Sequence, residues 1–359
     1  MMSHHDYMAY ALTLAEKGRN TVSPNPMVGC VIVKGGRIIG EGYHQKAGTP
    51  HAEIHALKQA GRGAMDATLY VTLEPCCHTG RTPPCTEAII QSKIKHIFIA
   101  TQDPYPRING RGIQLLNEAG IKIHLGLLQN EAQQLNEIFF HYAKTKRPFV
   151  IAKWAMSLDG KTVTHPKDDR TISSLRAHEK AHALRAKVDA ILIGAATARQ
   201  DNPILTTRYT ASHLPPKQPI RIVATTSGKL PRSLNLFDHT LPAKTIVATT
   251  KQGALRLRRI MMKKDIEILV LPQHKSGHIK LKSLLGALGK REITSLLVEG
   301  GMTLHESFME ENLINQLHIF LSPTLIGKMK SKKKLPYWKI QPDEENVHII
   351  AQHEETTHV

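Results

Sequence analysis

Hydrophobic and polar positions in the first 145 residues follow a period that switches between helical and extended. A helical stripe of apolar residues covers residues 7–17. Two extended apolar runs, residues 28–34 and 38–43, flank Gly35-Gly36 as in a β-hairpin. Further strands are predicted at residues 69–73, 97–101 and 121–125, and further helices at residues 52–60, 86–92, 112–119 and 130–144. This order predicts a layered α/β domain with a mixed sheet.

The helical pattern of residues 130–144 stops before Pro148, and a residue that precedes a proline is disfavoured in a helix. We therefore place a boundary there, with one domain over residues 1–146 and a second over residues 147–359. In the second domain, strands are predicted at residues 149–156, 190–193, 220–224, 245–248, 266–271 and 295–298. Helical stretches separate several of these strands, so the second domain is also predicted to be α/β.

Size and composition agree with two globular domains. The length of 359 residues exceeds the roughly 250 at which a single core stops growing, and the apolar share of 41% is globular. No run approaches the roughly 20 apolar residues of a membrane span, and residues 1–10 lack the apolar middle of a signal peptide. We expect a soluble, cytoplasmic protein with no membrane partner.

The charge balance is strongly basic. A formal charge of +18, from 48 Lys and Arg against 30 Asp and Glu, predicts attraction for phosphate groups on either polymers or small molecules. Part of this charge lies in runs that usually form solvated faces, namely Arg256, Arg258, Arg259, Lys263 and Lys264, and Lys328, Lys330, Lys332, Lys333 and Lys334. The second run lies in a tail, residues 328–359, where only residues 347–351 are predicted as a strand.

All four cysteines, at positions 30, 76, 77 and 85, lie in the first quarter of the chain. This distribution is a poor disulfide framework and favours metal binding. His51-Ala52-Glu53 and Glu74-Pro75-Cys76, together with Cys85, match the signature of zinc-dependent nucleobase deaminases. A catalytic zinc takes three protein ligands and one water, and His51, Cys76 and Cys85 supply that number.

Glu53 stands beside these ligands without being one. Bound zinc lowers the pKa of water from 15.7 to about 7, and Glu53 is predicted to take the proton and hand it to the departing ammonia. Cys85 follows Pro83-Pro84, so it is predicted to open a helix, whose positive end lowers the pKa of a thiol. Two other interpretations are a structural zinc site, with Cys77 or His78 as the fourth ligand, and unrelated core residues.

These residues lie in segments through which the chain resembles the bifunctional deaminase-reductase family of riboflavin biosynthesis. The segments are Pro24-Asn25-Pro26, Gly29-Cys30-Val31-Ile32-Val33, Gly42-Tyr43-His44, Pro50-His51-Ala52-Glu53, Thr72-Leu73-Glu74-Pro75-Cys76, His78 and Gly80-Arg81-Thr82-Pro83-Pro84-Cys85. Eight residues separate the two ligand cysteines, where many other zinc deaminases have two, and this spacing is a mark of the family.

The resemblance implies a cytidine-deaminase-like α/β/α fold for residues 1–146. It also implies a diaminopyrimidine substrate that carries a ribose phosphate and loses its ring amine as ammonia. By the same resemblance, the residues that line the pyrimidine and its phosphate are Asn25, His44, His78 and Arg81. From the residues alone, Asn25 between two prolines is equally a turn residue, and Arg81 is equally a surface charge.

The similarity resumes at Lys153-Trp154-Ala155-Met156-Ser157-Leu158-Asp159-Gly160-Lys161 and extends to about Gly327. It implies a dihydrofolate-reductase-like α/β fold for residues 147–359, NADPH as cofactor and reduction of the ribosyl group to ribityl. The implied substrate-binding residues are Arg185, Leu205, Arg208 and Glu299, and the implied cofactor-binding residues are Lys153, Ala155, Thr197, Asp201, Thr226, Gly300 and Gly301. Guanidinium groups suit a phosphate, and the glycines between a strand and a helix offer backbone amides to a cofactor phosphate. A Glu-Gly-Gly sequence such as Glu299-Gly300-Gly301 also occurs in ordinary strand-to-helix turns.

Two alternatives to a bifunctional enzyme stay open at this point. Asp169 and Thr171 stand where the family usually carries a serine and a tryptophan, which motivates a deaminase with a degenerate reductase domain. The charge of +18 motivates an RNA-editing type of deaminase. Against it, aromatic residues make up only 5% of the chain and no RNA-binding motif is present, so we expect no nucleic-acid partner. The resemblance also implies a homo-oligomer.

Overall fold

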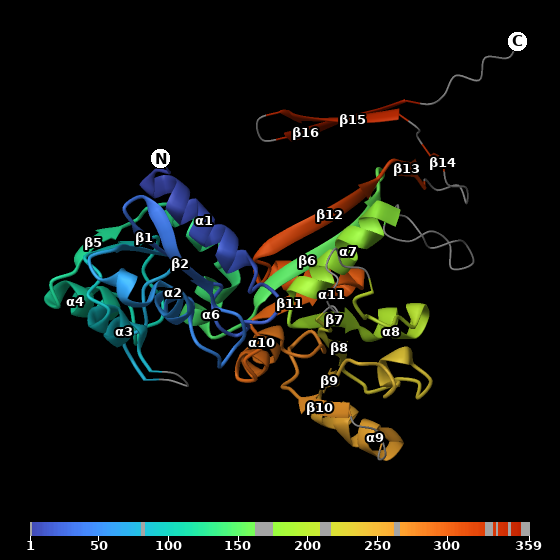
Figure 1. Cartoon of the computed structure of the whole chain (residues 1–359). Helices are drawn as coiled ribbons and strands as arrows, with labels where there is room; N and C mark the ends of the chain where they lie inside the picture. Colours follow the sequence, from blue (N-terminus) through green and yellow to red (C-terminus); the bar gives the residue numbers. More distant parts are fainter. Residues whose placement is uncertain are drawn as a thin grey trace, which may run out of the picture. The chain divides into compact units, whose positions relative to one another are not determined.

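The computed structural model describes residues 2–79, 83–161, 175–208, 217–261, 266–326, 333–334, 337–343 and 346–352 (Figure 1). Contacts between Cα atoms divide the chain into two compact units. The first unit is Met1–Phe149 with Lys280–Ser295, and the second is Val150–Ile279 with Leu296–Val359. The domain boundary at residue 146 stays a prediction.

The first unit is an α/β unit built on one sheet of five strands. Its strands are β1 (Gly29–Lys34), β2 (Arg37–Tyr43), β3 (Thr68–Val71), β4 (His96–Ile99) and β5 (Lys122–Leu125). Its helices are α1 (His4–Glu16), α2 (Ala52–Ala60), η1 (Gly61–Ala64), α3 (Cys85–Gln91), α4 (Arg111–Glu118), α5 (Gln129–Leu135), α6 (Glu137–Thr145) and α10 (Leu281–Gly289). The sheet order is β2-β1-β3-β4-β5, in which β1 is antiparallel to both neighbours and the other pairs are parallel. The predicted hairpin and the mixed sheet are confirmed.

Alternate residues of β1 face two different hydrophobic clusters, because successive side chains of a strand point to opposite faces. Cys30 and Ile32 pack in the cluster that contains Ala52 and Ala56 of α2. Val31 and Val33 pack in the cluster of α1. A Cβ on Gly29 would lie 1.9 Å from the carbonyl oxygen of Ala11, so only glycine permits α1 to pack this closely on the sheet.

The prediction of one continuous helix over residues 130–144 is wrong. The chain forms α5 and α6 instead, and Asn136 between them leaves the helical conformation with φ −109° and ψ 23°. The Asn136 side chain is buried and accepts a hydrogen bond from the Met27 amide at 2.8 Å. It also donates to the Met27 carbonyl oxygen at 2.9 Å, so this long-range pair ties the junction of α5 and α6 to Met27.

The second unit is built on a seven-stranded sheet with the order β10-β9-β8-β7-β11-β6-β12. Its strands are β6 (Phe149–Ser157), β7 (Ala190–Gly194), β8 (Ile220–Thr225), β9 (Thr245–Thr249), β10 (Ile266–Val270), β11 (Ser295–Val298) and β12 (Gln316–Ser322). Its helices are α7 (Leu175–Lys187), α8 (Ala195–Asp201), η2 (Asn235–Phe237), α9 (Lys251–Met261) and α11 (Met302–Glu310). Pairs β10/β9, β9/β8, β8/β7, β7/β11 and β6/β12 are parallel. The six predicted strands are confirmed, whereas β12 was not predicted.

The tail contains more strand than the sequence predicts. β16 (Asn346–Gln352) confirms the strand at residues 347–351, and it pairs antiparallel with β15 (Tyr337–Asp343). A short pair, β13 (Thr324–Leu325) and β14 (Lys333–Lys334), precedes it. The predicted α/β class is confirmed for both units. Within the described ranges, none of the helices has the length and apolarity needed to cross a membrane.

Candidate active sites

The three predicted metal ligands converge in the first unit. His51 is the residue before α2, and Cys85 is the first residue of α3, as its position after Pro83-Pro84 predicts. The Nδ1 atom of His51 lies 3.3 Å from the Cys85 Sγ atom and 3.5 Å from the Cys76 Sγ atom. These donor atoms all lie within 4.8 Å of one another.

The donor set fits zinc. With Zn–N near 2.0 Å and Zn–S near 2.3 Å, tetrahedral coordination places neighbouring donors about 3.5 Å apart, close to the two distances from His51. Cys77 lies outside this group, since its Sγ faces the carbonyl oxygen of Arg107 at 4.0 Å. A catalytic set of three ligands therefore fits better than a closed structural shell of four.

The two ligand thiols titrate in opposite directions. A hydrogen bond from the Cys85 thiol, supported by His51, lowers the pKa of Cys76 to about 4 although burial opposes it. The pKa of Cys85 is raised, because its thiol is hydrogen-bonded to Cys76 and is buried beside Glu53. Both shifts arise from the hydrogen bond between the two thiols, so the predicted effect of the helix end on the Cys85 pKa stays a prediction.

Glu53 lies on the first turn of α2 and is almost completely buried. Its Oε2 atom has no hydrogen-bond partner among the residues that the structure describes. Burial, followed by the charge of Cys76, raises the pKa of this carboxyl group. A buried carboxyl group with one oxygen uncommitted is suited to accept and return a proton beside the ligands.

A cavity of about 390 Å³ opens onto the metal ligands and Glu53. Asn25, His44 and His78 also line it, so the structure brings together three of the four residues that the family implies for the pyrimidine. Arg81, the fourth, lies outside the described residues. The Nδ1 atom of His78 is buried without a hydrogen-bond partner in the part of the chain described.

His44 orients the side chain of Asn25. Its Nδ1 atom faces the carbonyl oxygen of Pro50 at 3.4 Å, so Nδ1 carries the proton, and Nε2 accepts from the Asn25 amide at 3.3 Å. Burial, together with His51, lowers the pKa of His44 to about 4 and keeps the ring neutral. The carbonyl end of the Asn25 side chain is thereby left to other partners.

Asp103 and Glu74 also line this cavity, and the sequence did not single them out for a role there. Burial raises the pKa of Asp103 to about 7 against the hydrogen bond from the Tyr105 amide. Glu74 accepts hydrogen bonds from four backbone amides, those of Asp103, Gly110, Gly112 and Ile113. In the sequence, the position of Glu74 directly before Pro75-Cys76 was the feature that could have indicated a role near the metal ligands.

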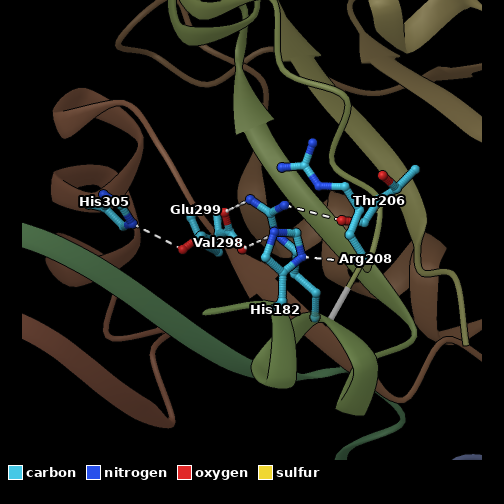
Figure 2. A network of polar contacts seen from close by, with 7 residues as sticks. His182, Thr206, Arg208, Val298, Glu299 and His305 are labelled. Atoms are coloured by element: carbon cyan, nitrogen blue, oxygen red, sulfur yellow. Dashed lines mark hydrogen bonds and ion pairs between the residues drawn. The ribbon is translucent and has the colours of Figure 1, made fainter. Parts of the chain in front are cut away.

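The second unit has a separate polar network around Glu299, the residue after β11 (Figure 2). Arg185 of α7 donates two hydrogen bonds to the Glu299 carboxylate, Nε to Oε1 at 2.7 Å and Nη2 to Oε2 at 2.6 Å. The side chains are 15% and 5% exposed, so this is a buried ion pair. Burial alone would raise the pKa of Glu299, but Arg185, with help from Lys153, holds it below its usual range.

Two further residues of the predicted reductase site lie within two positions of Thr206, whose carbonyl oxygen accepts a hydrogen bond from Arg185. Leu205 is buried, and the side chain of Arg208 is exposed. The Arg208 amide donates to Nδ1 of His182 at 3.3 Å, and Thr206 accepts from Arg185 at 3.3 Å through its carbonyl oxygen (Figure 2). His182 was not predicted; it lies three residues before Arg185 on α7, which was the available signal.

The cofactor-binding residues implied by the family occupy several strand ends of the second unit. Gly300 and Gly301 connect β11 to α11, and Gly301 has φ +84°. A Cβ at Gly300 would lie 2.9 Å from Cγ2 of Thr197, and one at Gly301 would lie 3.2 Å from its Oγ1. The bare backbone at this helix start fits a pyrophosphate, so these residues fit a dinucleotide cofactor.

The remaining members of that set are spread over three elements. Lys153 and Ala155 lie on β6, and Lys153 is close enough to Glu299 to influence its pKa. Asp201 ends α8, and the Thr226 carbonyl oxygen after β8 accepts from the Thr250 hydroxyl at 2.8 Å. The segment of residues 168–171, on which the degenerate-reductase alternative depends, lies outside the described residues.

Two family models match different parts of the chain. Residues 1–101 match the family model "Cytidine and deoxycytidylate deaminase zinc-binding region", and residues 148–342 match "RibD C-terminal domain". A curated relative from Aquifex aeolicus, "Riboflavin biosynthesis protein RibD", is 42% identical over 323 residues, covering 90% of this chain and 88% of the relative.

Two solved structures agree over almost the whole chain. The Acinetobacter baumannii RibD structure has a TM-score of 0.81 at 33% identity and covers 97% of this chain and 99% of its own. A Thermotoga maritima protein named diaminohydroxyphosphoribosylaminopyrimidine deaminase/5-amino-6-(5-phosphoribosylamino)uracil reductase has a TM-score of 0.78 at 34% identity, with 97% of each chain covered. Fold and site thus define a zinc-dependent deaminase joined to a reductase. The chain belongs to the RibD family of riboflavin biosynthesis proteins.

Proposed function

We propose that this chain catalyses two successive reactions of riboflavin biosynthesis. The first deaminates 2,5-diamino-6-(5-phosphoribosylamino)pyrimidin-4-one, and the second reduces the ribosyl group of the product to a ribityl chain with NADPH. The observation that carries the first reaction is the convergence of His51, Cys76 and Cys85 beside the buried carboxyl group of Glu53.

In the deaminase site, His51, Cys76 and Cys85 hold zinc, and zinc when bound supplies a Lewis acid that makes water nucleophilic near neutral pH. Glu53 takes a proton from the attacking water and returns it to the departing amine, so that water and the ring amine become a ring carbonyl and ammonia. Its raised pKa suits the stage at which it holds the proton.

Recognition of the pyrimidine falls to the side chains that line the cavity. The neutral ring of His44 fixes which end of the Asn25 amide faces the substrate, because the other end donates to His44. His78 offers a buried ring nitrogen that has no partner within the described residues. We assign the phosphate of this substrate to Arg81, whose guanidinium suits two phosphate oxygens.

In the reductase site, NADPH when bound supplies the hydride that reduces the ribosyl group. Gly300 and Gly301 let the cofactor phosphates approach the backbone, next to Thr197. Arg208 and Arg185 are assigned to the substrate phosphate. Arg185 uses three of its five N–H groups on Glu299 and Thr206, so its position is fixed before substrate arrives.

The test supplies the two substrates separately to the purified zinc protein. With the diaminopyrimidine phosphate alone, ammonia release is expected without any need for NADPH. With the deaminated product and NADPH, the absorbance of NADPH is expected to fall. Ammonia without any NADPH loss would leave a deaminase with an inactive reductase unit, and no ammonia would refute the deaminase assignment.

We further propose that the chain is cytoplasmic and assembles as a homo-oligomer. The family membership supports the second proposal, and sedimentation velocity of the purified protein tests it. A single species of about 40 kDa, the mass of one chain, would contradict it.

A further inference from the structure

The segment of residues 205–208 in the second unit is held to its surroundings through its backbone. The Thr206 carbonyl oxygen accepts from Arg185, and Thr207 exchanges two hydrogen bonds with the side-chain amide of Gln218, at 3.0 and 2.9 Å. The Arg208 amide donates to Nδ1 of His182 at 3.3 Å. Three consecutive residues are thus each fixed by a side chain from elsewhere.

The start of this segment adopts a costly conformation. Leu205 has φ +56°, in the left-handed region that a branched residue rarely occupies because the side chain crowds the backbone there. It persists only where the surrounding contacts determine the chain path. The contacts at Thr206, Thr207 and Arg208, together with the burial of Leu205, hold the chain on this path.

His182 requires one particular protonation state to make its contact. It is 4% exposed, and because a backbone amide donates to its Nδ1 atom, that atom cannot carry a proton. A neutral ring must then carry its proton on Nε2. Among the described residues, Arg185, Arg208, His178 and Glu299 are the charged or titratable groups that act on it. Burial, followed by the two arginines, lowers the pKa of His182 to about 4.

The contact bears directly on Arg208. The Arg208 side chain is exposed, whereas Thr206 and Thr207 before it are buried, so only its backbone is fixed from within the unit. His182 and Arg185 are three residues apart on α7 and therefore lie on one face of the helix. That face binds the backbone at both ends of residues 206–208 (Figure 2).

We propose that His182 is a positioning residue of the reductase reaction, which as a neutral imidazole fixes the backbone of Arg208 so that the guanidinium meets the substrate phosphate. The inference rests on the proposed function, in which Arg208 binds that phosphate. His182 itself touches neither substrate nor cofactor. It acts through Arg208, and its loss should weaken binding of the phosphorylated substrate without slowing the hydride transfer.

The first test compares steady-state kinetics of NADPH oxidation with the deaminated phosphorylated substrate. His182→Leu should raise the KM for this substrate about tenfold, as expected for loss of about 1.4 kcal/mol, while kcat and the KM for NADPH change less than about twofold. His182→Asn, whose Oδ1 can replace Nδ1 as acceptor, should restore the KM to within about threefold of the wild type. His239→Leu, at an exposed histidine of the second unit outside this helix, is the control and should change nothing.

A double-mutant cycle separates positioning from a general structural role. In an Arg208→Leu background, His182→Leu should raise the KM less than about twofold further, because the group it positions is gone. A full tenfold increase in that background would overturn the proposal, as would an unchanged KM in the single variant. An unchanged KM for NADPH in these variants reports that the second unit, which carries the substitutions, is folded.

Histidine ring 15N spectra of the wild type at pH 6 should assign His182 as neutral with its proton on Nε2, and a protonated ring would contradict the proposal. A fall in kcat of both His182→Leu and His182→Asn, with a lowered thermal midpoint, would show a structural role only and would also overturn it. Failure of the wild type to oxidise NADPH would instead refute the reductase assignment, and the inference with it.

Discussion

The two sites of this chain use their polar side chains in opposite ways. In the first unit, Glu53 and His78 each keep a buried polar atom without a described protein partner, and the three ligand atoms face one another. In the second unit, the buried charged groups of the predicted site are paired, as Arg185 is with Glu299, although Oγ1 of Thr207 and Nε1 of Trp154 have no partner within the described residues.

This difference indicates how each site prepares for its ligand. A site that receives a metal and a proton must leave donors and acceptors available inside a cavity. A site that binds a phosphorylated substrate by guanidinium groups must first hold those groups in place, because a flexible arginine loses side-chain entropy on binding. The predictions below test this contrast, starting from the largest effect.

Glu53→Gln should reduce ammonia release about 10³-fold, because the amide cannot take and return the proton. The zinc content should stay at the wild-type level, since Glu53 is not a ligand. Cys77→Ser is the matched control and should keep both zinc and activity. Metal analysis and an ammonia assay check this, and loss of zinc from Glu53→Gln would contradict the role given to Glu53.

Glu299→Gln should reduce NADPH oxidation about 100-fold and destabilise the second unit by about 3 kcal/mol, because it leaves the buried Arg185 without its counter-charge. The pKa of Glu299 is lowered in the folded state, so the ion pair stabilises above the ordinary glutamate pKa and is lost as pH falls through the folded value. An NADPH absorbance assay measures the loss of activity, and urea unfolding at pH 7 and pH 4 measures the loss of stability and its dependence on pH. An equal deficit at both pH values would contradict the ion-pair explanation.

Asn136→Ala should lower stability by about 2 kcal/mol, because it leaves the amide and carbonyl of Met27 without partners. Met27 is two residues from Asn25, so the KM of deamination should also rise a few-fold. Asn130→Ala, at an exposed position of α5, is the control. Thermal unfolding and deaminase kinetics check this, and equal behaviour of the two variants would exclude the bridging role of Asn136.

The smallest expected effect is a pH-dependent difference in thermal midpoint between the wild type and His182→Asn. Its pKa is near 6.5 when unfolded and about 4 when folded, so the unfolded chain binds more protons between these values. The wild type should therefore lose stability as pH falls from 6.5 to 4. His182→Asn lacks this loss, so the stability advantage of the wild type should narrow by a few degrees, and a constant difference would contradict it.

The sequence predicted the parts of the fold that depend on neighbouring residues. The hairpin around Gly35-Gly36, the helix Ala52–Ala60 and the helix start at Cys85 each follow from local signals, and each is confirmed. The zinc motif was readable for the same reason, since spacing within short segments fixes the ligand types.

The features of the fold and site that the sequence did not predict depend on contacts between residues far apart in the chain. Asn136, at the junction of α5 and α6, bonds to Met27, 109 positions away, and Arg185 pairs with a carboxylate 114 positions away. β12 pairs with β6, and its residues Leu317 and Ile319 are exposed. The strand is therefore not the fully buried apolar type that a sequence pattern predicts best. Periodicity within a short window carries no information about such partners.

The central claim is that one chain holds two chemically separate sites. It is tested most directly by measuring ammonia release and NADPH oxidation in the Glu53→Gln protein. When that protein receives the deaminated substrate and NADPH, we predict oxidation of NADPH at the wild-type rate, although its ammonia release from the first substrate is lost. A parallel loss of NADPH oxidation in a folded, zinc-loaded protein would contradict the claim.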